Sequence, residues 1–60
     1  MAGRLLTVDE VAGCLGISRR TFYRWRMLGI APATVKLPGG GLRVRADVLA
    51  EWLEEREDAA

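Results

Sequence analysis

The segment that decides the fold is "TVDEVAGCLGISRRTFYRW", residues Thr7–Trp25. Its start fits a capping box, in which the Thr7 hydroxyl accepts from the Glu10 N–H and the Glu10 carboxylate accepts from the Thr7 N–H. Gly16 can adopt the positive φ that ends a helix. The segment therefore predicts a short helix from Val8 to about Cys14. Its apolar face, at helical spacing, consists of Val8, Val11, Ala12 and Leu15.

A second helix is predicted directly after a tight turn, over Arg19–Leu28. Ser18 is a good N-cap, and Gly29 stands where a C-terminal glycine belongs. Helical geometry places Phe22 and Trp25 on one side, as core anchors. The opposite, outward side carries Arg20, Tyr23, Arg24 and Met27.

The cations of this second helix have no acidic residue of the same helix to pair with. A face that only solubilises a helix usually mixes charges of both signs, since opposite charges four residues apart stabilise it. The outward side is therefore better explained as an anion-binding face than as a solvated one.

Beyond Gly29 the apolar pattern alternates, which predicts two strands, Thr34–Leu37 and Leu42–Arg45. A four-residue connection over 38–41 would pair Leu37 with Leu42, Val35 with Val44, and Lys36 with Arg43. Two like charges opposite each other destabilise a sheet, so an anion is expected between the last pair. Arg45 continues this basic row.

A third helix is predicted from about 46 to 57, with an apolar stripe and an acidic outer face. The stripe consists of Val48, Leu49, Trp52 and Leu53. Asp47 in its first turn suits the positive end of the helix dipole. The acidic outer face should lie away from any polyanion.

The charge distribution says more than the net charge of +1 over 60 residues. No acidic residue occurs between 11 and 46, a range that holds seven of the nine Lys and Arg residues. One positive face and a polyanionic partner are therefore expected. There is no histidine, and the single Cys14 can form neither an internal disulfide nor a zinc site. We expect one domain, 1–60, without cofactor, metal or enzymatic activity, in the cytoplasm.

The order helix, turn, helix, hairpin, helix is that of a mainly α winged helix-turn-helix domain with a two-stranded wing over about 34–45. The spacing of Ala12, Gly16, Ile17, Phe22 and Trp25 fits the helix-turn-helix pattern. From "LLTVDEVAGCLGISRRTFYRW" through "VKLPGGGLRVRADVLAEWL", the chain resembles the small excisionase-like DNA-binding proteins related to MerR-type winged helices.

The resemblance implies double-stranded DNA as the partner. It places the arginines after the turn serine in the major groove and the basic hairpin along the minor groove or its phosphates. In this sequence the major-groove candidates are Ser18, Arg19, Arg20, Tyr23 and Arg24. The wing candidates are Lys36, Gly40, Arg43 and Arg45. Arg20 and Arg24 would read base edges, and the other basic residues and Tyr23 would hold phosphates.

The resemblance further implies a DNA-bending accessory role in site-specific recombination. Copies of the protein would bind adjacent sites and direct a phage integrase toward excision. The lack of a long dimerisation helix after Leu53 favours this role over a ligand-sensing regulator. Two alternatives stay open: a small transcriptional regulator acting at a promoter, and an adaptor whose arginine stripe docks an acidic protein.

Overall fold

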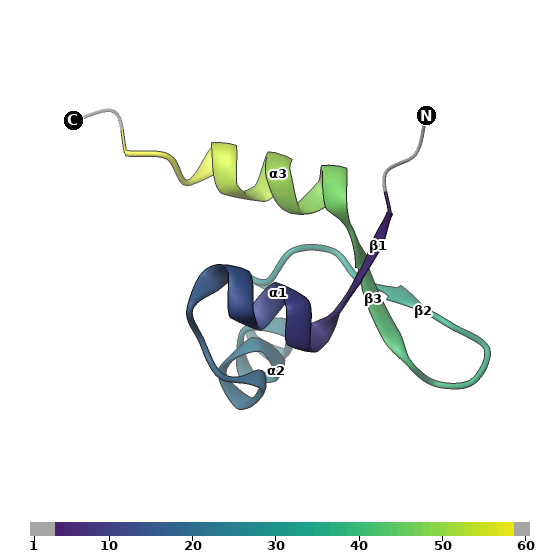
Figure 1. Cartoon of the computed structure of the whole chain (residues 1–60). Helices are drawn as coiled ribbons and strands as arrows, with labels where there is room; N and C mark the ends of the chain where they lie inside the picture. The colour runs from purple at the N-terminus through teal and green to yellow at the C-terminus, as the bar shows by residue number, and fades with distance from the viewer. Residues whose placement is uncertain (1–3, 59–60) are drawn as a thin grey trace.

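The computed structural model describes residues 4–58, which form three helices and a three-stranded antiparallel sheet. Figure 1 shows α1 between α2 and α3, with the β2–β3 hairpin projecting away from the helices. This is the winged helix-turn-helix architecture predicted from the sequence. Within the described range no helix is long and apolar enough to cross a membrane. In chain order the elements are β1 (Leu5–Thr7), α1 (Val8–Leu15), α2 (Arg19–Leu28), β2 (Val35–Lys36), β3 (Leu42–Arg45) and α3 (Ala46–Glu55).

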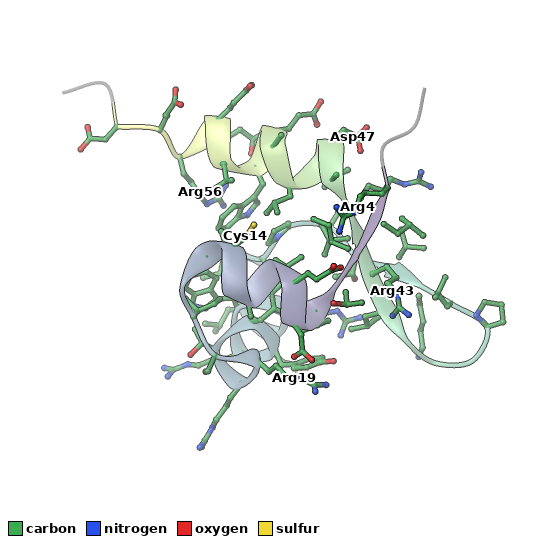
Figure 2. The ribbon with its side chains drawn as sticks, viewed as in Figure 1. Arg4, Cys14, Arg19, Arg43, Asp47 and Arg56 are labelled. Atoms are coloured by element: carbon green, nitrogen blue, oxygen red, sulfur yellow. The ribbon has the colours of Figure 1, made fainter. Side chains whose placement is uncertain are left out.

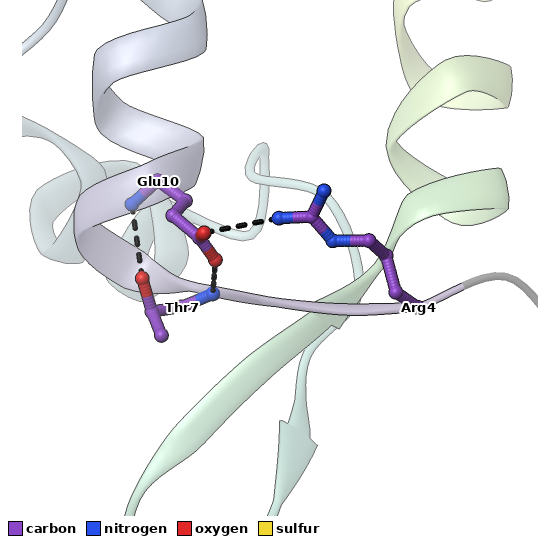
Figure 3. A network of polar contacts seen from close by, with 3 residues as sticks. All are labelled: Arg4, Thr7 and Glu10. Atoms are coloured by element: carbon purple, nitrogen blue, oxygen red, sulfur yellow. Dashed lines mark hydrogen bonds and ion pairs between the residues drawn. The ribbon is translucent and has the colours of Figure 1, made fainter.

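The start of α1 is fixed by the predicted capping box (Figure 3). The Glu10 N–H donates to Thr7 Oγ1 at 3.1 Å, and the Thr7 N–H donates to Glu10 Oε1 at 2.9 Å. Arg4 Nη2 adds a third contact, donating to Glu10 Oε2 at 3.0 Å. One carboxylate thus joins the residue before β1 to the first turn of α1.

This network predicts a pH dependence of stability. The Thr7 N–H bond, with Arg4 nearby, lowers the pKa of Glu10 below its ordinary 4.5 despite some opposing desolvation. A lowered folded-state pKa contributes stability that is complete above the unfolded-state value and is lost as the pH falls through the folded-state value. At neutral pH the urea midpoint of the wild type should therefore be higher than that of Glu10→Gln. The difference between the two midpoints should shrink as the pH falls below 4.5.

The matched control for this titration is Glu51→Gln. Glu51 lies on α3, and its carboxylate makes no hydrogen bond or ion pair with any residue in 4–58. The difference in urea midpoint between wild type and Glu51→Gln should be small, and it should not depend on the hydrogen bond from the Thr7 N–H to Glu10. A Glu10→Gln gap that stays constant down to pH 3 would mean that the capping box does not hold the ionised carboxylate.

Helix α2 has the bounds that the sequence predicts, because both of its caps are local. Ser18 Oγ accepts from the Thr21 N–H at 3.1 Å, and the helix ends at Gly29 with a φ of 78°. The Ile30 N–H donates to the Trp25 carbonyl at 3.0 Å, which completes the C-terminal motif. The turn before α2 closes on Gly16, whose φ is 69°.

The sheet differs from the prediction in two respects. Strand β1 was not predicted, and it pairs with β3 so that β3 is the central strand. The register of the hairpin is also shifted by one residue, so Lys36 lies opposite Leu42, and Val35 lies opposite Arg43. The expected pairing of Lys36 with Arg43 was therefore wrong.

The shift of register comes from Gly40. The Gly40 N–H donates to the Leu37 carbonyl, and the Leu37 N–H donates to the Gly41 carbonyl, both at 2.8 Å. With a φ of 93°, Gly40 acts as the left-handed residue of a three-residue connection over 38–40, instead of the four-residue connection assumed from the sequence. Because successive side chains of a strand point to opposite faces, a shift of one residue changes which residues of β2 and β3 share a face of the sheet.

The core lies where α1, α2, β3 and α3 meet. Phe22, Val11 and Val44 are fully buried, which confirms Phe22 as a core anchor. Trp25 is only partly buried and lies against Trp52 of α3, with ring centroids 6.2 Å apart. The buried cluster consists of Val8, Val11, Phe22, Val44 and Leu49.

Helix α3 follows β3 with no residue between them, since β3 ends at Arg45 and α3 begins at Ala46. The Ala46 N–H donates to the Arg4 carbonyl at 3.0 Å and so continues the pairing with the segment before β1. At the other end of α3, Trp52 Nε1 donates to the Ile30 carbonyl at 3.0 Å, and the Arg56 guanidinium stacks 4.1 Å above the Trp52 ring. Leu53, expected in the apolar stripe, is 44% exposed.

Candidate nucleic-acid interface

The outward side of α2 is exposed, as predicted. Arg20, Tyr23, Arg24 and Met27 are all exposed, whereas Phe22 between them is fully buried. Within residues 4–58 no carboxylate forms an ion pair with Arg20 or Arg24. Both guanidinium groups are therefore exposed with their charge uncompensated by any residue in this range, which suits them to phosphates or to guanine edges.

Arg19 differs from these two arginines. Its Nε lies 3.3 Å from Oδ1 of Asp9, on the first turn of α1. The expectation that no cation of this helix has a counter-charge was therefore wrong for Arg19. Helical spacing predicts ion pairs only within one helix, whereas here the tight turn brings the starts of α1 and α2 together. Ten positions separate Asp9 from Arg19, and only the helix-turn-helix geometry makes them neighbours.

The start of α1, the start of α2 and the tip of the wing enclose a cleft of about 320 Å³. It brings together four of the residues predicted to contact DNA: Arg19 and Tyr23 from α2, and Gly40 and Arg43 from the wing. In Figure 2, Arg19 lies on the side of α1 that faces away from α3. Asp47 and Arg56 lie on the opposite side, next to α3. The remaining lining residues are Thr7, Val8, Asp9, Gly41 and Leu42.

Arg43 reaches this cleft in a constrained conformation. It is half-buried, and its Nη1 donates to the Leu42 carbonyl at 2.9 Å. A Cβ at Gly41 would lie only 3.2 Å from that Nη1, so glycine leaves room for the guanidinium. The wing thus presents one oriented cation toward α2.

Two of the predicted wing residues, Lys36 and Arg45, do not line this cleft. Opposite residues of an antiparallel pair share a face, so Lys36 lies on the face of Leu42, while Arg43 shares the other face with Val35. Arg45 is exposed and lies opposite Leu5, at the junction with α3. The expected single row of Lys36, Arg43 and Arg45 is therefore divided between two faces of the sheet.

Ser18 and Arg26 are engaged within the protein. Ser18 Oγ accepts from the Thr21 N–H and also donates to Thr21 Oγ1 at 3.0 Å, so its hydroxyl caps α2. Arg26 Nε donates to Thr34 Oγ1 at 3.3 Å and so connects α2 to the segment before the wing. Of the residues described, no group of three His, Cys, Asp or Glu is placed to hold a metal ion.

Comparison with known proteins agrees with the helix-turn-helix fold. The family model described as a helix-turn-helix domain matches residues 5–57, which covers all three helices and the wing. No match of significance was found among curated proteins or among solved structures. The chain belongs to the helix-turn-helix domain family, a DNA-binding family that includes excisionase-like proteins.

Proposed function

We propose that this protein is a DNA-bending accessory factor of site-specific recombination, which binds adjacent sites cooperatively and directs an integrase toward excision. The observation that carries the DNA-binding part is the exposed, uncompensated pair Arg20 and Arg24 beside a cleft lined by Arg19 and Arg43. Both parts of a winged helix thus direct cations toward one region.

The roles of the residues follow from their positions. Arg20 and Arg24, whose guanidinium groups pair with no carboxylate in 4–58, enter the major groove and donate to guanine O6 and N7. Arg19, Tyr23 and Arg43 hold backbone phosphates at the cleft, together with the backbone around Gly40, which fixes the register without reading sequence. Lys36 and Arg45 add phosphate contacts outside the cleft, and Ser18 holds the start of α2 in place.

The accessory role is supported by the small size of the interface. A single module of this kind buries only about 600–1,000 Å² on DNA. Copies bound side by side gain affinity through their effective concentration, and each bends the duplex toward a shape that favours recombination. The family match is consistent with this role because the family includes excisionase-like proteins.

The test begins with binding to duplex DNA over a range of salt concentrations, followed by footprinting on genomic fragments. DNA binding predicts a linear fall of log K with log salt, with a slope that corresponds to several phosphates. Such a slope would eliminate the alternative of an adaptor for acidic proteins, whereas a failure to bind duplex DNA would favour it. Direct repeats protected beside an attachment site support the recombination role, whereas a single protected promoter site indicates a transcriptional regulator.

Replacing Lys36 with alanine should weaken binding to cognate and random duplexes equally. Lys36 is exposed and forms no ion pair with any residue in 4–58, so its charge is free for a phosphate. The loss of one phosphate contact should reduce the salt slope by about 0.9. Lys36→Arg, which keeps the charge, should retain the slope. A weakening confined to the cognate duplex would show that Lys36 contacts a base instead.

A further inference from the structure

One carboxylate of the first turn of α1 stands inside the basic surface. Glu10, its neighbour, completes the capping box, whereas the carboxylate of Asp9 makes no hydrogen bond with any residue in 4–58. Asp9 instead lines the cleft, and its Oδ1 lies 3.3 Å from Nε of Arg19. The first turn of α1 therefore adds a negative charge to the site that would hold a DNA phosphate.

We propose that Asp9 competes with the DNA backbone for Arg19. In the free protein Asp9 pairs with the guanidinium, and in the complex a backbone phosphate takes its place. This inference rests on the proposed function, because it assigns Arg19 to a phosphate. Asp9 thereby keeps the affinity of the protein for all DNA below the level that its arginines alone would give.

The exposure of the pair makes this exchange feasible. The side chains of Arg19 and Asp9 are 62% and 69% exposed. Exposed ion pairs are weak contacts, since water and salt screen them and both side chains lose conformational freedom. A phosphate offers Arg19 two charge-assisted hydrogen bonds in a planar, bidentate geometry, which is a stronger interaction.

The cleft explains why Asp9 continues to act after the exchange. Arg19, Arg43 and Tyr23 line the same space of about 320 Å³ as Asp9, so a phosphate held by the two arginines lies near the carboxylate. At such a short range two negative charges repel each other even at a partly screened surface. In the complex, repulsion between the Asp9 carboxylate and the phosphate therefore still lowers the binding affinity. In the free protein the ion pair with Arg19 neutralises the charge of Asp9.

The decisive variant is Asp9→Asn, which has nearly the same shape without the charge. Binding is measured by fluorescence anisotropy to a random-sequence duplex, and to a duplex selected from a random library with the wild-type protein. We expect both affinities to rise by about 2- to 5-fold, the range that corresponds to one exposed ion pair. The salt slope should steepen by up to about 0.9, because Arg19 then neutralises its phosphate without a carboxylate beside it that retains a cation.

Glu51→Gln is the matched control, since it removes the same charge from α3, outside the cleft. It should leave both affinities close to wild type, because no residue of α3 lines the cleft and salt screens exposed charges that lie far from a bound phosphate. Circular dichroism at the binding temperature confirms that each variant is folded. An affinity of Asp9→Asn equal to that of Glu51→Gln, or weaker than wild type, overturns the inference.

A double-mutant cycle with Arg19→Ala tests whether the effect passes through Arg19. Without the guanidinium, Asp9→Asn should give less than half of its gain in the wild-type background. A full gain in the Arg19→Ala background would show that Asp9 acts only by repelling DNA directly, which contradicts competition for Arg19. If the wild type itself lacks salt-dependent DNA binding, the proposed function fails. If the wild type binds and Asp9→Asn brings no gain, only the present inference fails.

Discussion

The Phe22→Ala variant is expected to be unfolded at room temperature. Phe22 is fully buried in the cluster formed with Val11, Val44 and Leu49. Its ring also contacts the Tyr23 ring edge-on, with the two ring centroids 5.9 Å apart. Removing a buried aromatic ring costs about 3–5 kcal/mol, through lost burial and the cavity left behind. A domain of this size has only about 3–5 kcal/mol of stability in total. The substitution therefore removes nearly all of it.

Far-UV circular dichroism and urea denaturation measure this outcome. Met27→Ala is the matched control, because Met27 lies on the same helix with an equally apolar side chain that is 84% exposed. Its effect should stay within about 0.5 kcal/mol, as for most surface substitutions. A Phe22→Ala protein with a cooperative transition near that of Met27→Ala would show that the helices do not pack around this ring.

The second large effect is expected for DNA binding by Arg24→Ala. Arg24 is exposed and has no ion-pair partner within residues 4–58, so its guanidinium is free to donate to a guanine. The loss of a bidentate base contact should weaken binding to the cognate duplex by about 1–3 kcal/mol, or roughly 5- to 150-fold. Binding to random duplexes should change much less, because it depends on phosphates.

Two comparisons separate base reading from phosphate binding. Arg24→Lys keeps the charge and loses the planar fork, so it should restore random binding and leave most of the cognate loss in place. Equal losses on cognate and random duplexes for Arg24→Ala would assign Arg24 to the backbone. The same result would leave the DNA-binding role intact and remove its sequence-reading part.

Both of these residues could be assigned from the sequence because their positions depend on local rules. The caps at Ser18 and Gly29 fix the bounds of α2, and helical periodicity then decides that Phe22 faces inward and Arg24 outward. The capping box at Thr7 fixes the start of α1 in the same way. Each of these signals lies within four residues of the feature that it determines.

The features that the sequence analysis missed depend on partners distant in the chain. Strand β1 has only three residues and is defined by its pairing with β3, about forty positions later. The register of the wing depends on whether Gly40 adopts a positive φ, which composition alone does not decide between three adjacent glycines. The ion pair between Asp9 and Arg19 likewise requires the angle between two helices.

The direct passage from β3 into α3 has a mechanical consequence. Because no linker separates Arg45 from Ala46, and the Ala46 N–H is bonded to the Arg4 carbonyl, the strand and the helix form one stiff lever. A force applied at the wing tip would therefore reach α3 directly, because no flexible linker lies between them to absorb it.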